Sequence, residues 1–189
     1  MNTIEAIYGR RSIRKFNTDP VSTELIEKII RAGIQAPSGM NRQPWKFTIL
    51  QTEKKAQLLE IMSKRAQWLK KFKMNTEGYE FTIQSMRQAP LIILVWNTGF
   101  QPKPIFIPFY RYLRLIDIQS IGGAIQTMLL AAQELGLGTL WICNVFRADK
   151  QIRTFLRKRE ELIAAIAIGY ANEQPEARPR KDWIEAVET

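Results

Sequence analysis

The residues best suited to chemistry in this sequence lie in the segment GRRSIRKF, residues 9–16. It holds Arg10, Arg11, Arg14 and Lys15 within eight positions, with the hydroxyl of Ser12 between them. Cations at this density repel one another, so such a run is either a solvated helix end or a seat for an anion. Arginine suits the second role, because its planar guanidinium binds phosphate through paired hydrogen bonds. The segment alone leaves both alternatives open.

The chain contains no histidine and a single cysteine, Cys143. This excludes Ser-His-Asp and Cys-His catalytic sites, an intrachain disulfide, and any metal site built on histidine or on a cysteine cluster. Histidine is also the side chain whose ordinary pKa suits proton transfer near neutral pH. If the protein is an enzyme, we expect a bound cofactor to carry the reaction and no side chain to act as a catalytic residue.

The 189 residues suit a single domain, and hydrophobic residues at 46% and charged residues at 24% are typical of a soluble globular protein. The longest apolar run, PLIILVW at 90–96, has the length of a strand, and the N-terminus has no signal-peptide pattern. We therefore expect a cytoplasmic protein that does not enter the membrane.

The net charge of +10 raises the possibility of nucleic-acid binding. The Lys and Arg residues are scattered, however, and no helix-turn-helix, zinc finger or RNA-binding aromatic motif accompanies them. A general positive field attracts any anionic ligand, nucleotides included. We expect a small-molecule partner and no nucleic acid.

Helical and strand periodicities alternate along the chain. Helices are predicted at 3–8, 22–33, 53–73, 117–135 and 149–157, and strands at 45–50, 91–96, 139–145 and 162–170. Residues 97–115 follow neither period and hold three prolines and five aromatic residues, which is typical of a lid or insert, and 171–189 form a polar arm. No strand is followed by a Rossmann or P-loop glycine motif, so a bound phosphate would have side chains as its ligands.

Four motifs in order resemble the FMN-dependent nitroreductase family: RRSIRKF, APSGMNRQPW, DIQSIGGAIQTMLLAAQELGLGTLWI, and IGY followed by RPRK. They extend from about residue 4 to 184. The resemblance implies an α+β fold, an α-β-α sandwich with a mixed central sheet flanked by helices, assembled as a domain-swapped homodimer. It also implies hydride transfer from NAD(P)H through FMN N5 to a nitroaromatic, quinone or enone by a ping-pong mechanism.

The resemblance also implies which residues bind FMN. Arg10, Arg11, Ser12 and Arg14, with Arg178 and Arg180 from the tail, would hold the phosphate and ribityl chain. Pro37, Ser38, Gly39, Asn41 and Gln43 would reach the flavin from the other subunit, although Pro and Gly would equally serve a plain turn. Trp141, Ile142, Cys143 and Asn144 would lie against the ring. Cys143 has apolar neighbours, so a buried, inert thiol is expected.

The aromatic residues of the lid segment leave two alternatives open. Phe100, Phe106, Phe109, Tyr110 and Tyr112 could cover the flavin and stack on an aromatic acceptor, or they could pack at the dimer interface. Alternatives also remain for the function. A protein of this fold could carry out reductive dehalogenation or flavin cleavage, or bind FMN without turnover.

Overall fold

The computed structural model describes residues 2–99 and 107–188, and the side chains of residues 107–109 are outside the description. Four strands, β1 (Trp45–Leu50), β2 (Leu91–Asn97), β3 (Gly138–Ile142) and β4 (Glu161–Gly169), form one sheet in the order β1-β2-β4-β3. All three strand pairs are antiparallel. The parallel component of the expected mixed sheet is confined to an isolated bridge between Ser12 and Thr139.

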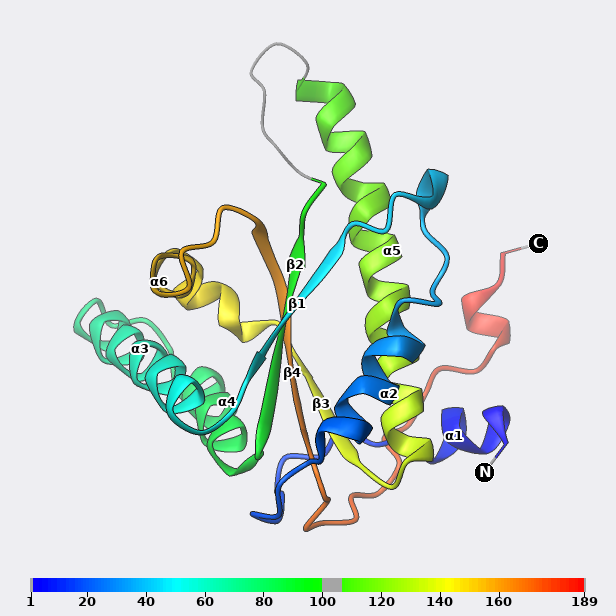
Figure 1. Ribbon diagram of the computed structural model, residues 1–189, viewed down its shortest axis with the longest axis horizontal. Coiled ribbons are helices and arrows are strands. Elements are labelled where there is room, and N and C mark those ends of the chain that lie inside the picture. The colour runs from blue at the N-terminus through cyan, green and yellow to red at the C-terminus, as the bar shows by residue number, and fades with distance from the viewer. Residues whose placement is uncertain (1, 100–106, 189) are drawn as a thin grey trace.

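Helices cover both faces of this sheet, which confirms the α+β sandwich (Figure 1). On one face lie α3 (Thr52–Lys71), α4 (Glu77–Gln88) and α6 (Asp149–Phe155). On the other lie α2 (Thr23–Gly33) and α5 (Ile107–Glu134), with α1 (Thr3–Gly9) near the C-terminal end of α5. Short 3-10 helices are η1 (Gly39–Asn41), η3 (Asn144–Ala148) and η4 (Ile184–Ala186). A separate apolar core fills each side of the sheet.

The inner strand β2 is covered by helices and apolar side chains on both faces of the sheet. Every residue of LIILVWN is buried, and its alternate side chains enter opposite cores, Ile92 and Leu94 on one side and Ile93 and Val95 on the other. A strand buried on both faces is a continuous apolar run, as the sequence has it.

Two helices differ from the expectation. Helix α4 was not predicted, although it buries Tyr79, Ile83 and Met86 at helical spacing. Helix α5 begins at Ile107, ten residues before the predicted start at 117. The prediction began the helix too late because it took Pro108 as a sign of irregular structure. Proline is tolerated in the first turn of a helix, since the N–H that it lacks would have no partner there.

The length of α5 also corrects the expectation about apolar runs. Within Tyr110–Glu134 an 18-residue window has a mean hydropathy of 1.3, and the helix meets the length and composition of a membrane-crossing helix. The core helix of a globular protein meets the same test. Here the helix packs against α2, and it buries Ile121, Ile125 and Met128 in the core on that face of the sheet.

Candidate functional site

The arginine-rich N-terminal segment is held in place by backbone hydrogen bonds at the edge of the sheet. Ile13 N donates to Thr139 O of β3 over 2.9 Å, and Asn17 N donates to Tyr170 O over 2.9 Å. Gly138 permits this approach, because a Cβ there would lie 2.8 Å from the Ile13 side chain. Residues 12–17 are therefore fixed between β3 and the segment after β4.

The two ends of the chain meet at this edge and enclose a cleft of about 310 Å³, the cationic cleft. It brings together all six residues that were predicted for the phosphate: Arg10, Arg11, Ser12, Arg14, Arg178 and Arg180. Glu173 tightens the junction by accepting hydrogen bonds from the backbone N–H groups of Arg14 and Lys15.

The cleft carries an excess of positive charge, because five arginines and a single carboxylate, Glu176, line it. In the part of the chain that the structure describes, none of the five arginines forms an ion pair. Burial, followed by the charges of Arg180 and Arg11, lowers the pKa of Arg10. Positive charges held together in this way are stabilised by an anion, and the donor set fits a phosphate monoester.

Three of the arginines also bond to backbone carbonyls, and one of them is Arg180, whose Nη1 donates to Pro179 O over 3.4 Å. Arg11 Nη1 donates to Tyr8 O over 2.6 Å, at the end of α1, and Arg14 Nη1 donates to Ser12 O over 3.0 Å. A guanidinium has five N–H donors, so both keep donors free for a ligand. These bonds orient the two side chains at the mouth of the cleft.

A second cleft of about 470 Å³, the ring cleft, adjoins the first and shares Arg14 and Arg178 with it. Its walls include all four residues predicted for the flavin ring: Trp141, Ile142, Cys143 and Asn144. Helix α4 supplies the opposite wall through Phe81, Thr82 and Ser85, which sequence reasoning missed together with the helix. The signal that could have found them is the helical spacing of Tyr79, Ile83 and Met86.

The side chains at the end of β3 and directly after it alternate in exposure. Ile142 is buried in the core, whereas Trp141 is 38% exposed and Cys143 is exposed. The expectation of a buried thiol at Cys143 was wrong, because apolar neighbours in sequence lie on opposite faces of a strand. The Asn144 amide donates to Thr82 Oγ1 over 3.0 Å, so it ties the end of the strand to α4.

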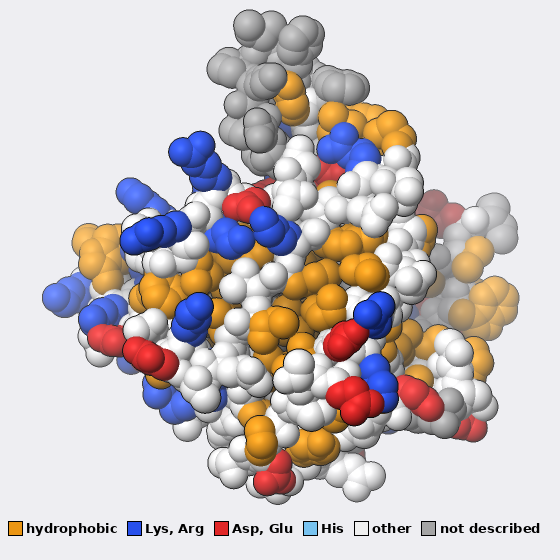
Figure 2. Space-filling model, in the orientation of Figure 1, with side chains coloured by type: hydrophobic (Ala, Val, Ile, Leu, Met, Phe, Trp, Pro, Cys, Tyr) orange, Lys and Arg blue, Asp and Glu red, His pale blue; other side chains and the backbone are white. Residues whose placement is uncertain are grey.

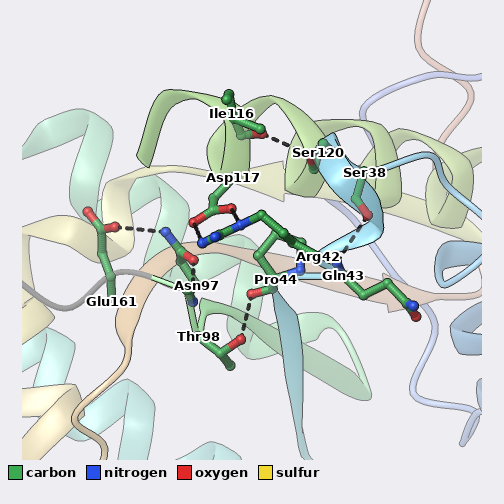
Figure 3. Close-up of polar contacts among 12 residues, drawn as sticks. Ser38, Arg42, Gln43, Pro44, Asn97, Thr98, Ile116, Asp117, Ser120 and Glu161 are labelled. Atoms are coloured by element: carbon green, nitrogen blue, oxygen red, sulfur yellow. Dashed lines mark hydrogen bonds and ion pairs between the residues drawn. The ribbon is translucent and has the colours of Figure 1, made fainter. Parts of the chain in front are cut away.

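The predicted loop at residues 37–43 is clamped to α5 (Figure 3). Arg42 donates to both carboxylate oxygens of Asp117, over 3.1 and 3.2 Å, and Gly39 N donates to Ser120 Oγ over 3.2 Å. Within the loop, Gln43 N donates to Ser38 Oγ over 3.0 Å. A Cβ on Gly39 would lie 2.2 Å from Ile116 Cγ2, so a glycine is needed for this close approach.

The clamp holds a strained backbone. Met40, Asn41 and Gln43 have φ values of 55°, 52° and 45°, in the left-handed region that non-glycine residues rarely adopt. The side chains of Asn41 and Gln43 are exposed and hydrogen-bonded to each other, with Gln43 Nε2 donating to Asn41 Oδ1 over 3.3 Å. Sequence reasoning missed Arg42 and Asp117, because nothing local marks a pair this far apart in the chain.

The loop does not reach the clefts of its own chain. No residue of 37–43 lines the cationic cleft or the ring cleft. Gly39 contacts α5 at Ser120, whereas Gly9 at the end of α1 lies near Gln133, 13 residues farther along the helix. That separation is about 20 Å at 1.5 Å per residue, and Figure 1 shows η1 and α1 well apart along α5.

A family model named Nitroreductase family matches residues 7–170. The chain belongs to this family. A nitroreductase-family relative from Archaeoglobus fulgidus, named NADH dehydrogenase/NAD(P)H nitroreductase, is 29% identical and covers 97% of this chain and 90% of its own length. An iodotyrosine deiodinase from Thermotoga neapolitana is 28% identical, over 93% of this chain and 91% of its own length. A crystal structure from Desulfovibrio desulfuricans, in complex with FMN, has a TM-score of 0.78 at 28% identity and covers 99% of this chain and 95% of that one.

The aromatic residues that were predicted to form a lid lie only partly within the described structure. Phe100 and Phe106 lie outside the described residues, as does the side chain of Phe109. Tyr110 is half-buried and Tyr112 is 61% exposed, both on α5. Residues 107–115, the second half of the segment that was predicted to be irregular, thus form the first turns of α5.

Proposed function

We propose that this chain is a homodimeric FMN-dependent oxidoreductase that reduces a small electrophilic acceptor, such as a nitroaromatic, a quinone or an enone, with NAD(P)H. The observation that carries the proposal is the cationic cleft, in which five arginines from both ends of the chain lack carboxylate partners beside an adjoining cleft. The FMN complex of the Desulfovibrio protein and the name of the Archaeoglobus relative support it.

Each cleft has a separate task in this proposal. Arg10, Arg14, Arg178 and Arg180 would bind the FMN phosphate, and Arg11 and Ser12 would complete the donor set. The ring cleft would hold the isoalloxazine against residues 141–144. Bound FMN supplies the chemistry, which is uptake of a hydride from NAD(P)H and delivery of two electrons to the acceptor. This chemistry suits a chain without histidine, because the protons can come from water.

The loop that carries Asn41 and Gln43 would complete the site of the partner subunit. It lies about 20 Å along α5 from the α1 end of the cationic cleft, and its residues line neither the cationic cleft nor the ring cleft of its own chain. Its amide side chains are exposed, and the contacts with α5 hold its backbone. In a two-fold dimer each loop can reach the other chain's ring cleft, which gives two composite sites.

The test is reconstitution with FMN followed by steady-state NAD(P)H oxidation with menadione or nitrofurazone. We expect a yellow protein that releases FMN, and no FAD, on denaturation, and that turns over both acceptors. FAD in the released flavin, or no flavin after incubation with excess FMN, would contradict the assignment. Bound FMN without any oxidation of NAD(P)H would show that the protein binds FMN but is not an oxidoreductase.

The iodotyrosine deiodinase relative favours a second candidate, reductive removal of halide from an aromatic ring. Reduced protein mixed with 3-iodotyrosine would release iodide in that case. We expect menadione to oxidise the reduced protein faster than 3-iodotyrosine does. If 3-iodotyrosine oxidises the reduced protein faster, reductive dehalogenation becomes the first candidate function and reduction of quinones or nitroaromatics the second.

A further inference from the structure

A third cleft opens beside the ring cleft. It has a volume of about 700 Å³ and shares Trp141 and Cys143 with the ring cleft, so the two adjoin. Its walls are mainly apolar, with Phe146 and Leu162 among them, and Arg153 and Arg159 also line it. A ligand lying against the flavin ring could extend from there into this apolar cleft.

Arg153 and Arg159 belong also to a fourth cleft, the basic cleft, of about 510 Å³. The remaining lining residues come from α6 and the turn that follows it: Lys150, Thr154, Arg157 and Lys158. Figure 2 shows Lys and Arg side chains gathered on the side of the molecule where α6 lies. The ring cleft, the apolar cleft and the basic cleft thus adjoin in sequence.

The basic cleft has cations without counter-ions. Arg153 pairs with Asp149 at 3.5 Å and Lys158 with Glu160 at 3.8 Å. The side chains of Lys150, Arg157 and Arg159 form no hydrogen bond or ion pair with the residues that the structure describes. Glu161, the other carboxylate of the apolar cleft, is bound to Arg114.

We infer that the basic cleft binds the 2′-phosphate of NADPH and that the enzyme prefers NADPH to NADH. The inference rests on the proposed function, which requires the nicotinamide to reach the ring cleft. The rest of the dinucleotide then has to leave along an adjoining surface, and the apolar cleft leads to Arg159. NADPH and NADH differ by one phosphate monoester, and arginine forks bind such a group through paired, charge-assisted hydrogen bonds. NADH has a neutral hydroxyl there and would leave the cations without a partner.

The experiment compares kcat/KM for NADPH and NADH in the FMN-loaded protein with a fixed concentration of menadione. We expect a preference for NADPH of at least about tenfold, the effect of a charge-assisted hydrogen bond or more. Arg159→Ala and Arg157→Ala should each lower kcat/KM for NADPH by about tenfold and leave the value for NADH within about twofold. Arg87→Ala is the matched control, because it removes an exposed arginine on α4 that lines none of these clefts.

Calorimetric titration with adenosine 2′,5′-bisphosphate and with adenosine 5′-monophosphate gives a readout independent of turnover. The bisphosphate should bind more tightly, and Arg159→Ala should remove the difference. Equal kcat/KM values for NADPH and NADH, or equal binding of the two nucleotides, would overturn this inference and leave the proposed function standing. A protein that binds no FMN would overturn the proposed function, and the titration would still decide whether the basic cleft recognises the 2′-phosphate.

Discussion

Arg42 and Asp117 form a two-pronged ion pair between the 37–43 loop and α5, with the Asp117 side chain 1% exposed and that of Arg42 28% exposed. The pair is unequal, because only Arg42 can turn toward water when its partner is lost. The buried carboxylate has no such alternative. A carboxylate left alone in the interior carries a large desolvation cost.

We therefore expect Arg42→Ala to destabilise the fold by about 3 kcal/mol and Asp117→Asn by about 1–2 kcal/mol. The double variant should be destabilised by less than the sum of the two single effects, because without Asp117 no buried carboxylate is left unpaired by the loss of Arg42. Urea denaturation of the four proteins measures these values, and Arg87→Ala again controls for loss of an exposed arginine. Strictly additive effects would show that the pair does not hold the loop.

The cationic cleft predicts how FMN affinity depends on single arginines. Arg14→Ala and Arg180→Ala should each weaken FMN binding by about 1.5–3 kcal/mol, the range for hydrogen bonds to a charged group, without unfolding the apoprotein. Fluorescence quenching of FMN gives the dissociation constants. Lys15→Ala is the control, because Lys15 is exposed and lies outside the cleft. Unchanged FMN affinity in both arginine variants would show that these arginines are solvated surface residues and do not bind the phosphate.

The proposed division of the site between two chains predicts complementation. Suppose that Arg14→Ala and Asn41→Ala each inactivate the homodimer. When the two are refolded together, about half of the dimers are mixed, and each mixed dimer has one site built from wild-type residues only. Activity should therefore return to about a quarter of the wild-type value. No recovery, with mixed dimers demonstrated by a tag on one chain, would place both residues in the same site.

Tyr79 predicts a loss of stability in alkali. Its side chain is buried, its hydroxyl has no hydrogen-bond partner in the described structure, and burial raises its pKa to about 12 against the opposing charges of Arg65 and Arg147. The unfolded chain, with its ordinary pKa near 10, loses the proton first. Stability therefore falls between pH 10 and 12 by about 1.4 kcal/mol per pH unit.

Tyr79→Phe removes this titration and also the unpartnered hydroxyl. The variant should be at least as stable as the wild type at pH 8, and its advantage should grow above pH 10, as measured by urea denaturation across that range. Tyr112→Phe, at a side chain that is 61% exposed, should show no such growth. Parallel pH profiles for wild type and Tyr79→Phe would mean that Tyr79 ionises freely in the folded protein.

The sequence determined the type of most elements, with α4 and the first turns of α5 as exceptions, and the kinds of residue in the site. The apolar run of β2, the spacing of Ile26 and Ile29 in α2, and the glycine and proline punctuation of the 37–43 loop all act over a few residues. Local periodicity is set by the helix and strand repeats themselves, so it is readable from the chain. The arginine motifs at both ends were predicted through the resemblance to the nitroreductase family, because the residues alone left the solvated alternative open.

Tertiary structure alone decided which of these residues meet. The convergence of Arg14 with Arg178, the clamp of Arg42 on Asp117 and the adjoining clefts from Trp141 to Arg159 all depend on contacts between distant segments. The exposure of Cys143 and the place of α4 beside it also depend on how the layers pack over the sheet. Local sequence sets the direction of a side chain relative to its own element, whereas its neighbours are fixed only when the elements pack together.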